Sequence, residues 1–169
     1  MNTTISDFFD SPTKESYLKA HETIVSSDRF DPGMIDVFDD IYTLADEGKH
    51  AEAIELLNKS MDNLALSPLA HHMLFQLYSI LDQQEQSIEA FDKYLACIDG
   101  IKSTGDGSEH APYIVVRVSD ERDVLAELEK TPGGQRLITV DDRHFDVIEC
   151  DDDSVYWFDI TSAYGGYGG

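Results

Sequence analysis

The chain has 169 residues and carries 34 acidic side chains against 12 basic ones, which gives a formal charge of −22. Its hydrophobic content of 41% is enough to bury a core, so the composition excludes a disordered chain. The length suits one domain or two very small ones. Because the sequence has no basic patch, direct binding to a phosphate backbone or to an anionic membrane surface is also excluded.

The N-terminal segment Met1–Asp10 has neither a basic region nor an apolar stretch, so it does not resemble a signal peptide. No run approaches the roughly 18 apolar residues that a membrane-spanning helix needs. The two cysteines, Cys97 and Cys150, lie far apart within apolar patterns, which favours two buried free thiols over a disulfide. These features predict a soluble, cytoplasmic protein of bacterial type.

Three proline dipeptides mark helix starts in the first hundred residues. Ser11-Pro12, Asp31-Pro32 and Ser67-Pro68 each place a capping oxygen before a proline suited to the first helical turn. Apolar residues then recur at helical spacing in five segments. The predicted helices cover residues 12–26, residues 35–48, Ala51–Leu64, Leu69–Leu81 and Glu85–Ile98.

The predicted helices repeat with an offset of 34 residues, at which Ala53-Ile54-Glu55 matches Ser87-Ile88-Glu89. This period, with Gly48 at the turn between two helices and Ala53 at their close contact, resembles the tetratricopeptide repeat. Asp40, Asp82 and Ser87 depart from that consensus. Two repeats with one extra helix are fewer than the about three that usually make a self-sufficient stack. We therefore expect another part of the chain to cover the end of the helical array.

The remainder of the chain predicts a small sheet with one helix. Residues 103–110 form a glycine-rich polar stretch, which is typical of a loop. Apolar runs then follow in the order β-α-β-β-β, with aspartates at the hairpin turns. The predicted elements are the strand Tyr113–Val118, the helix Asp120–Lys130 ended by Thr131–Gly134, and the strands Gln135–Val140, His144–Cys150 and Ser154–Thr161.

Together these elements predict an α+β fold, in which an array of about five helices packs on the small sheet unit. The expected boundaries are 1–102 for the helical part, 111–161 for the sheet unit and 162–169 for a flexible tail of glycine and tyrosine. The sheet is expected to cover an apolar face of the last helix, with Trp157 at the junction. That face consists of Ile88, Phe91, Leu95 and Ile98.

The second half of the chain also carries an ordered set of motifs. They are Gly105-Asp106-Gly107-Ser108, Ser119-Asp120-Glu121, Phe145–Glu149 and Tyr156–Ile160. Their order, within about residues 15–161, resembles an uncharacterised bacterial family called domain of unknown function 4919, whose members carry tetratricopeptide-like helices before this segment. The resemblance implies the α+β fold and no assigned activity. Many members of that family look exported, which this chain does not.

The loop Gly105–His110 is the best candidate for a small-molecule site, because glycines let backbone N–H groups approach a ligand. Its candidate residues are Gly105, Asp106, Gly107, Ser108 and His110. The alternative is that the glycines only shape the turn between the helical and sheet parts. No metal or cofactor is expected, since the adjacent His71 and His72 cannot ligate one ion from a helix. Asp151–Asp153 lacks the ligand spacing of a calcium loop.

No arrangement in the sequence is typical of catalysis. Cys150 has no adjacent base, no serine lies in a G-x-S-x-G elbow, and no pair of carboxylates stands out among the many. We therefore expect a protein without enzymatic activity. A small enzyme that gathers His110 or Cys150 with a base in a deep pocket is the third hypothesis.

The leading hypothesis is a non-enzymatic protein-interaction module. Paired helices of this type expose their first helices along a concave surface, and an acidic surface with aromatic edges favours a basic or polar protein partner. The residues assigned to it are Asp36, Asp39, Asp40, Tyr42, His72 and Gln76. The alternative is an acidic immunity or inhibitor protein, or a nucleic-acid mimic, whose regularly placed carboxylates block a basic target.

Overall fold

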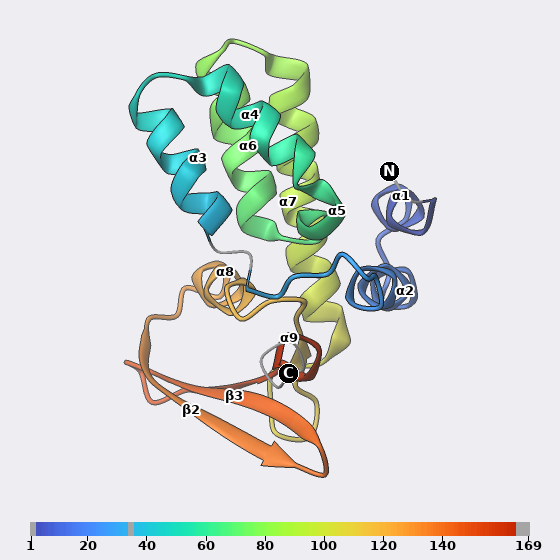
Figure 1. Cartoon of the computed structure of the whole chain (residues 1–169). Coiled ribbons are helices and arrows are strands. Elements are labelled where there is room, and N and C mark those ends of the chain that lie inside the picture. Colours follow the sequence, from blue (N-terminus) through green and yellow to red (C-terminus); the bar gives the residue numbers. More distant parts are fainter. Residues whose placement is uncertain (1–2, 34–35, 165–169) are drawn as a thin grey trace.

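The computed structural model describes residues 3–33 and 36–164, without the side chain of Asp36. A helical part precedes a small sheet, which confirms the predicted α+β fold (Figure 1). The helices before the sheet are α1 (Thr3–Asp10), α2 (Lys14–Val25), α3 (Asp36–Asp46), α4 (His50–Lys59), α5 (Met61–Leu64), α6 (Pro68–Ile80) and α7 (Gln84–Thr104).

Side-chain caps set the starts of two of these helices. Ser67 accepts a hydrogen bond from the backbone N–H of Ala70 and precedes Pro68 at the first turn of α6, as predicted. Helix α2 begins later than predicted, because Thr13 and Ser16 form a reciprocal capping box after Pro12.

The sequence does not predict α1, which packs on α2 through Ile5 and Phe8. The Phe8 ring meets the Tyr17 ring edge-on, with centroids 5.7 Å apart. Both rings lie against Gly100, where an added Cβ would stand 2.5 Å from the Tyr17 ring and 2.9 Å from that of Phe8. Helix α7 therefore runs past its predicted end at Ile98 and supports the N-terminal helices along its last turns.

The hairpins α3–α4 and α6–α7 have equivalent turns, 34 residues apart. Gly48 and Asp82 occupy the same position with φ of 75° and 55°. In the first turn the Lys49 N–H donates to Leu44 O at 2.8 Å, and in the second the Gln83 N–H donates to Tyr78 O at 2.9 Å. Both are helix ends closed by a residue in the left-handed region. The offset found in the sequence is thus present in the backbone.

The sheet has four strands in the spatial order β1-β4-β3-β2. The C-terminal elements are β1 (Tyr113–Ile114), α8 (Asp120–Glu127), β2 (Pro132–Val140), β3 (Arg143–Cys150), β4 (Val155–Asp159) and α9 (Thr161–Tyr164). β1 runs parallel to β4, and the other neighbours are antiparallel. The predicted strand Tyr113–Val118 is shorter than expected, because the Arg117 N–H donates to Asp120 Oδ2 at 2.9 Å and the chain turns into α8. The order β-α-β-β-β holds.

The start of the predicted tail is helical. Residues 162–164 belong to α9, and the Tyr164 ring lies 4.0 Å from the ring of His144 on β3. Residues 165–169, which complete the predicted tail, lie outside the described residues.

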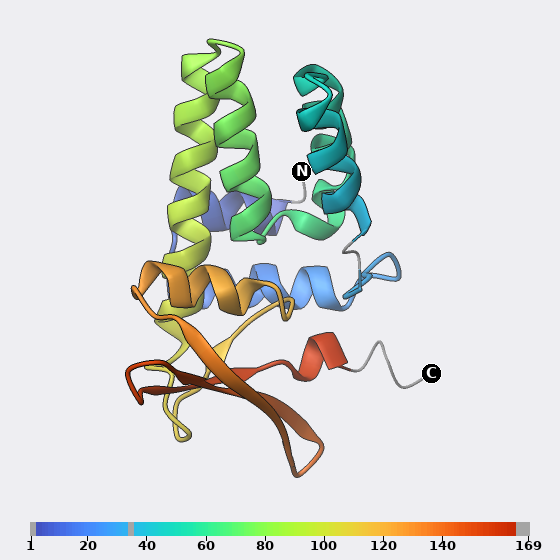
Figure 2. The ribbon, with the colours of Figure 1, turned by 90° about the vertical axis from the view of Figure 1, so that its left-hand side faces the viewer.

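One hydrophobic core joins the helices to the sheet. It includes Tyr17 of α2, Ile98 and Ile101 of α7, Leu125 of α8 and Phe158 of β4, all nearly inaccessible to solvent. A second core lies between the two hairpins and contains Leu57 and Leu77 among others. Helix α8 lies crosswise between the hairpins and the sheet (Figure 2). The sheet therefore packs on the C-terminal end of α7 and on α8.

Two expectations about this junction are wrong. Ile88, Phe91 and Leu95 are 62%, 38% and 37% exposed, because the sheet reaches only the end of α7, where Ile98 is buried. Trp157 lies on the far face of the sheet, opposite Val147 in the ladder, with its ring 5.9 Å from that of Phe145. Strand alternation places Phe158 on the helix-facing side instead.

Within the described part of the chain, none of the helices has an apolar stretch able to cross a bilayer.

Candidate functional site

A cleft of about 410 Å³ lies where the hairpins, α8 and the sheet meet. Its apolar lining consists of Phe38, Tyr42, Leu69, Val118, Pro132 and Ile148. Its polar lining consists of Asp39, Ser119, Glu121, Arg122 and Gln135. We call this site the junction cleft. In Figure 1, the helix α3 lies above α8, and the sheet lies below α8.

Each wall presents its side chains through ordinary secondary-structure geometry. Phe38 and Tyr42 are one helical turn apart on α3, so they share a face. Phe38 is anchored in the hairpin core, whereas Tyr42 is 51% exposed. Gln135 and Ile148 are partners in the β2–β3 ladder and point to the same side of the sheet. The cleft therefore exists only while the helical part and the sheet are docked.

A buried carboxyl pair lies beside the cleft. Glu121 is 2% exposed, and burial, together with the charge of Asp146 and a side-chain hydrogen bond to it, raises the pKa of Glu121 to about 9. Glu121 is thus protonated at neutral pH and donates to Asp146. Gln135 Nε2 also donates to Asp146 Oδ2, at 2.6 Å. The pair is a neutral acid held against a carboxylate, and Glu121 Oε1 has no hydrogen-bond partner among the described residues.

A second buried group supports the start of α8. Burial raises the pKa of Asp120 to about 7, although the charge of Arg117 opposes the shift. The Arg117 guanidinium lies 5.4 Å from the centroid of the Phe30 ring and donates to Asp31 O at 3.3 Å. These contacts tie the segment between α2 and α3 to α8, which helps to place α3 above the cleft.

Asp123 connects α8 to α6. Burial raises the pKa of its carboxyl to about 6, while a hydrogen bond from the Leu69 backbone opposes the shift. An acidic side chain at the first turn of α6 also complements the partial positive charge of that helix end. Leu69, which lines the cleft, is held in place by this contact.

Sequence reasoning missed this carboxyl cluster. Glu121 and Asp146 belong to different elements, and no local spacing relates them. One signal was available, because Asp146 interrupts the apolar run of the strand Phe145–Ile148. An acidic residue on the helix-facing side of a strand needs a buried partner.

The residues predicted for partner binding divide between two places. Asp39 and Tyr42 line the junction cleft, and Asp40 is exposed on α3 outside its lining. The backbone of Asp36 lies in α3, but its side chain is outside the described part. His72 and Gln76 lie on α6, and neither lines the cleft.

His72 belongs to a group of four rings on the surface of the α6–α7 hairpin. Its ring lies 6.0 Å from Phe75 and 5.5 Å from Tyr94, and Phe91 lies 5.1 Å from Phe75 and 5.9 Å from Tyr94. Burial, followed by the charges of Glu127 and Asp123 on α8, raises the pKa of Tyr94. The rings pack against one another and form a partly exposed aromatic surface.

Several backbone groups of the loop Gly105–His110 already form hydrogen bonds with neighbouring parts of the chain. The N–H groups of Asp106 and Gly107 both donate to Ala111 O, at 2.9 and 3.0 Å, and Gly107 O accepts from the Trp157 N–H. Gly107 has a φ of 77°, and a Cβ there would stand 2.6 Å from the Tyr113 ring. A hydrogen bond from the Ser108 side chain, followed by the one that the Ser108 N–H donates to Asp106 Oδ1, lowers the pKa of Asp106. His110 is exposed. The geometry supports a role of these glycines in shaping the turn.

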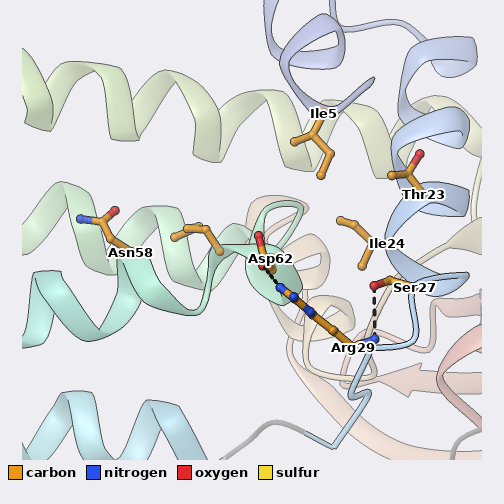
Figure 3. A pocket seen from close by; sticks show the side chains of 8 residues that line it. Ile5, Thr23, Ile24, Ser27, Arg29, Asn58 and Asp62 are labelled. Carbon is orange, nitrogen blue, oxygen red and sulfur yellow. Dashed lines mark hydrogen bonds and ion pairs between the residues drawn. The ribbon is translucent and has the colours of Figure 1, made fainter. Parts of the chain in front are cut away.

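A second cavity, of about 440 Å³, lies between α1, α2 and the α4–α5 segment (Figure 3). Ile5 and Ile24 form its apolar side, and Arg29 points toward Asp62 across it, with Nη1 3.1 Å from Oδ2. Both charged side chains are largely exposed, so this ion pair contributes little to stability. Sequence reasoning did not identify this cavity.

Cys97 and Cys150 are free and buried, which confirms the predicted thiols. Among residues 3–33 and 36–164, no group of three or more histidine, cysteine, aspartate or glutamate side chains could hold a metal ion.

Comparison with known proteins places the chain in one family. The family model described as "Domain of unknown function (DUF4919)" matches residues 24–165. No curated protein and no solved structure matches the chain. Since the match spans most of the 169 residues, the chain belongs to the DUF4919 family of domains of unknown function.

Proposed function

We propose that this protein is a non-enzymatic interaction module that holds a segment of a protein partner in the junction cleft. The observation that carries the proposal is the cleft itself, which places exposed apolar side chains from both halves of the molecule around one opening. Tyr42 is 51% exposed and Val118 is 39% exposed. A concave apolar site with a few polar groups is the usual form of a binding site.

The polar groups of the cleft support binding rather than catalysis. Within the described residues, its lining contains no histidine, cysteine or lysine to activate a nucleophile. Ser119 has no histidine in that lining to act as its base, and the protonated Glu121 supplies no negative charge at neutral pH. The cleft can bind a segment through apolar contacts and through hydrogen bonds donated by Gln135 and Arg122.

The acidic side chains that α3 places at the cleft favour a partner with an apolar segment and basic flanks. Asp39 lines the cleft, and Asp40 lies exposed next to it on α3. Opposite charges at the rims of two partners speed their association, and this attraction weakens as the salt concentration rises. The hairpins with their 34-residue offset support a tetratricopeptide-like description, in which the first helices, α3 and α6, form the binding side.

The placement of carboxylates favours this function over a nucleic-acid mimic. On the hairpins, Glu55 and Glu89 form ion pairs with lysines one helical turn away. Some other carboxyl groups are buried at the junction, as Asp120 and Asp146 are, or belong to tight turns, as Asp141 and Asp142 do. These carboxylates are therefore not free charges of a regular array.

The test compares two equivalent substitutions of exposed valine and isoleucine. Val118→Asp places a charge in the cleft, and Ile80→Asp places the same charge on the exposed end of α6, 58% accessible and outside the cleft. Each purified variant captures partners from lysate of the native cells at about 50 mM and about 500 mM salt, with circular dichroism confirming the fold.

We expect Val118→Asp to reduce the captured partner at least tenfold and Ile80→Asp to leave it unchanged. High salt is expected to weaken capture by the unmodified protein. Equal capture by both variants would contradict the assignment of the cleft, and recovery of only acidic partners would contradict its charge preference.

A further inference from the structure

We propose that the free edge of β2 receives the partner segment as an added strand, so that the partner is held by backbone hydrogen bonds beside the junction cleft. The inference rests on the proposed function, because it specifies how the partner of that cleft is recognised. Extended segments that add to a sheet edge gain affinity from the main chain and specificity from alternate side chains.

β2 is a long and open edge. It is the outermost strand of the order β1-β4-β3-β2, it spans Pro132–Val140, and nearly all of its residues are exposed. Natural proteins usually shorten, charge or cover such edges, because an open one invites pairing with another chain. β2 carries Arg136 as its only charged residue.

The hydrogen bonds of β3 show which groups of β2 face outward. The Cys150 N–H donates to Ser154 O, and His144 O accepts from the Ile160 N–H. The even-numbered residues of β3 therefore point their backbone N–H and C=O groups toward β4. Its odd-numbered residues point their backbone groups toward β2, where Phe145 pairs with Ile138 and Val147 pairs with Arg136. The alternate residues of β2 turn their backbone groups away from the sheet.

These outward residues are Gln135, Leu137 and Thr139. Within residues 3–33 and 36–164, no strand, loop or side chain bonds to their N–H and C=O groups. Three residues with both groups free, spaced by two, match the repeat of an incoming strand.

The edge opens next to the junction cleft. The side chains of Gln135 and Leu137 lie on the same face of the sheet as Ile148, which lines the cleft, and Leu137 is 48% exposed. A strand added along β2 would place every second side chain on this face. Those side chains would lie against Leu137 and reach toward Tyr42.

Charge selects the occupant of the edge. β2 has no acidic residue, but aspartates stand at both ends. Asp141-Asp142 lie in the turn after it, and Asp151 and Asp153 lie beside its start, where the Asp151 N–H donates to Thr131 O and Asp152 is already paired with Lys130. A segment with an apolar centre and basic ends complements this pattern. A second copy paired antiparallel would bring the Asp141-Asp142 turn of one chain near Asp151–Asp153 of the other, which is repulsive.

The probe is a fluorescein-labelled peptide of alternating valine and threonine between two pairs of lysines. The control peptide has glutamates in place of the lysines. Binding to the full chain is measured by fluorescence anisotropy, with peptide concentrations up to about 1 mM. We expect the lysine peptide to bind at least tenfold more tightly than the glutamate peptide.

Two variants at one position separate the backbone from the side chain. Leu137→Pro removes an outward N–H that no β2–β3 bond uses, and proline is tolerated at such edge positions. Leu137→Thr shortens the side chain but keeps the N–H. We expect Leu137→Pro to lower the affinity for the lysine peptide at least tenfold, and Leu137→Thr to change that affinity by less than about threefold.

Amide hydrogen exchange on the unmodified protein tests the geometry without any substitution. Peptide binding is expected to slow exchange at Gln135, Leu137 and Thr139 and to leave Arg136 and Ile138, already bonded to β3, unchanged. Absence of peptide binding, protection without this alternation, or dimers that Leu137→Pro dissolves in sedimentation would each overturn the proposal. If Val118→Asp abolishes partner capture but Leu137→Pro does not, the cleft function stands and strand addition fails.

Discussion

The junction and the helical hairpins place their acidic residues differently. At the junction, Asp120, Glu121 and Asp146 are buried. Asp120 lies near the charge of Arg117, and Asp146 accepts hydrogen bonds from Gln135 and from the protonated Glu121. On the hairpins, Glu55 and Glu89 stay at the surface beside lysines. Exposed pairs contribute little to stability, whereas buried carboxyl groups make it depend on pH and on each partner. Sensitivity to mutation and to pH should therefore concentrate at the junction.

The largest expected effect separates the two faces of β4. Phe158→Ala removes a fully buried ring from the shared core and should cost about 3–5 kcal/mol. Trp157→Ala acts on the far face, where the side chain is only half-buried, and should cost about 1 kcal/mol. Urea unfolding followed by circular dichroism measures both. A larger loss for Trp157→Ala would place the wrong face of the sheet against the helices.

The next effect is the pH dependence of stability. The folded chain holds the Glu121 proton more tightly than the unfolded chain, since the pKa rises from 4.5 to about 9. The stability associated with this proton is fully present below the unfolded value and is lost as pH rises through the folded value. Asp120 and Asp123, with pKa values raised to about 7 and about 6, act in the same direction. Stability should therefore fall from about pH 5 to about pH 9.

Glu121→Gln tests the origin of that slope, because the amide keeps a donor for Asp146 and cannot ionise. We expect the variant to reduce the slope by up to about 1.4 kcal/mol per pH unit between about pH 5 and about pH 9. Glu52→Gln, on the exposed side of α4, is the control and should leave the slope unchanged. An unchanged slope in Glu121→Gln would mean that this carboxyl ionises normally.

The smallest effects concern the two equivalent hairpin turns. Gly48 and Asp82 both have positive φ, and no atom lies within 4 Å of a Cβ added at Gly48, so only backbone strain opposes Gly48→Ala. This substitution should cost about 1 kcal/mol, and Asp82→Gly should stabilise the chain by less than about 1 kcal/mol. Both effects should be the same at about pH 5 and about pH 8, because no buried carboxyl is involved. Thermal unfolding at the two pH values checks this contrast with the junction.

Local patterns predicted the elements better than their contacts. Ser67-Pro68 gave a correct helix start, and the offset of 34 residues recurs in the two turns. Helix α1 was missed because its eight residues show only two buried apolar positions and no marked cap. The predicted position of Trp157 at the junction was wrong because the strand Tyr156–Ile160 carries apolar residues on both faces. Alternation alone therefore does not show which face packs against the core.

The candidate site could be predicted only in part. Asp39 and Tyr42 were identified from the repeat, since a periodic helix reveals which side chains share a face. The other walls of the cleft come from α8 and β2, and their meeting with α3 is a long-range contact that spacing does not encode. The Glu121–Asp146 pair depends on the same docking.

The central claim is that the helical part and the sheet form one cooperative unit with the cleft between them. The single tryptophan, Trp157, reports the sheet by fluorescence, and circular dichroism at the helical wavelength reports the hairpins. Both signals are followed in one urea titration of the full chain. We predict coincident transitions with the same midpoint. A tryptophan transition well separated from the helical one would show that the sheet unfolds alone and would contradict the shared site.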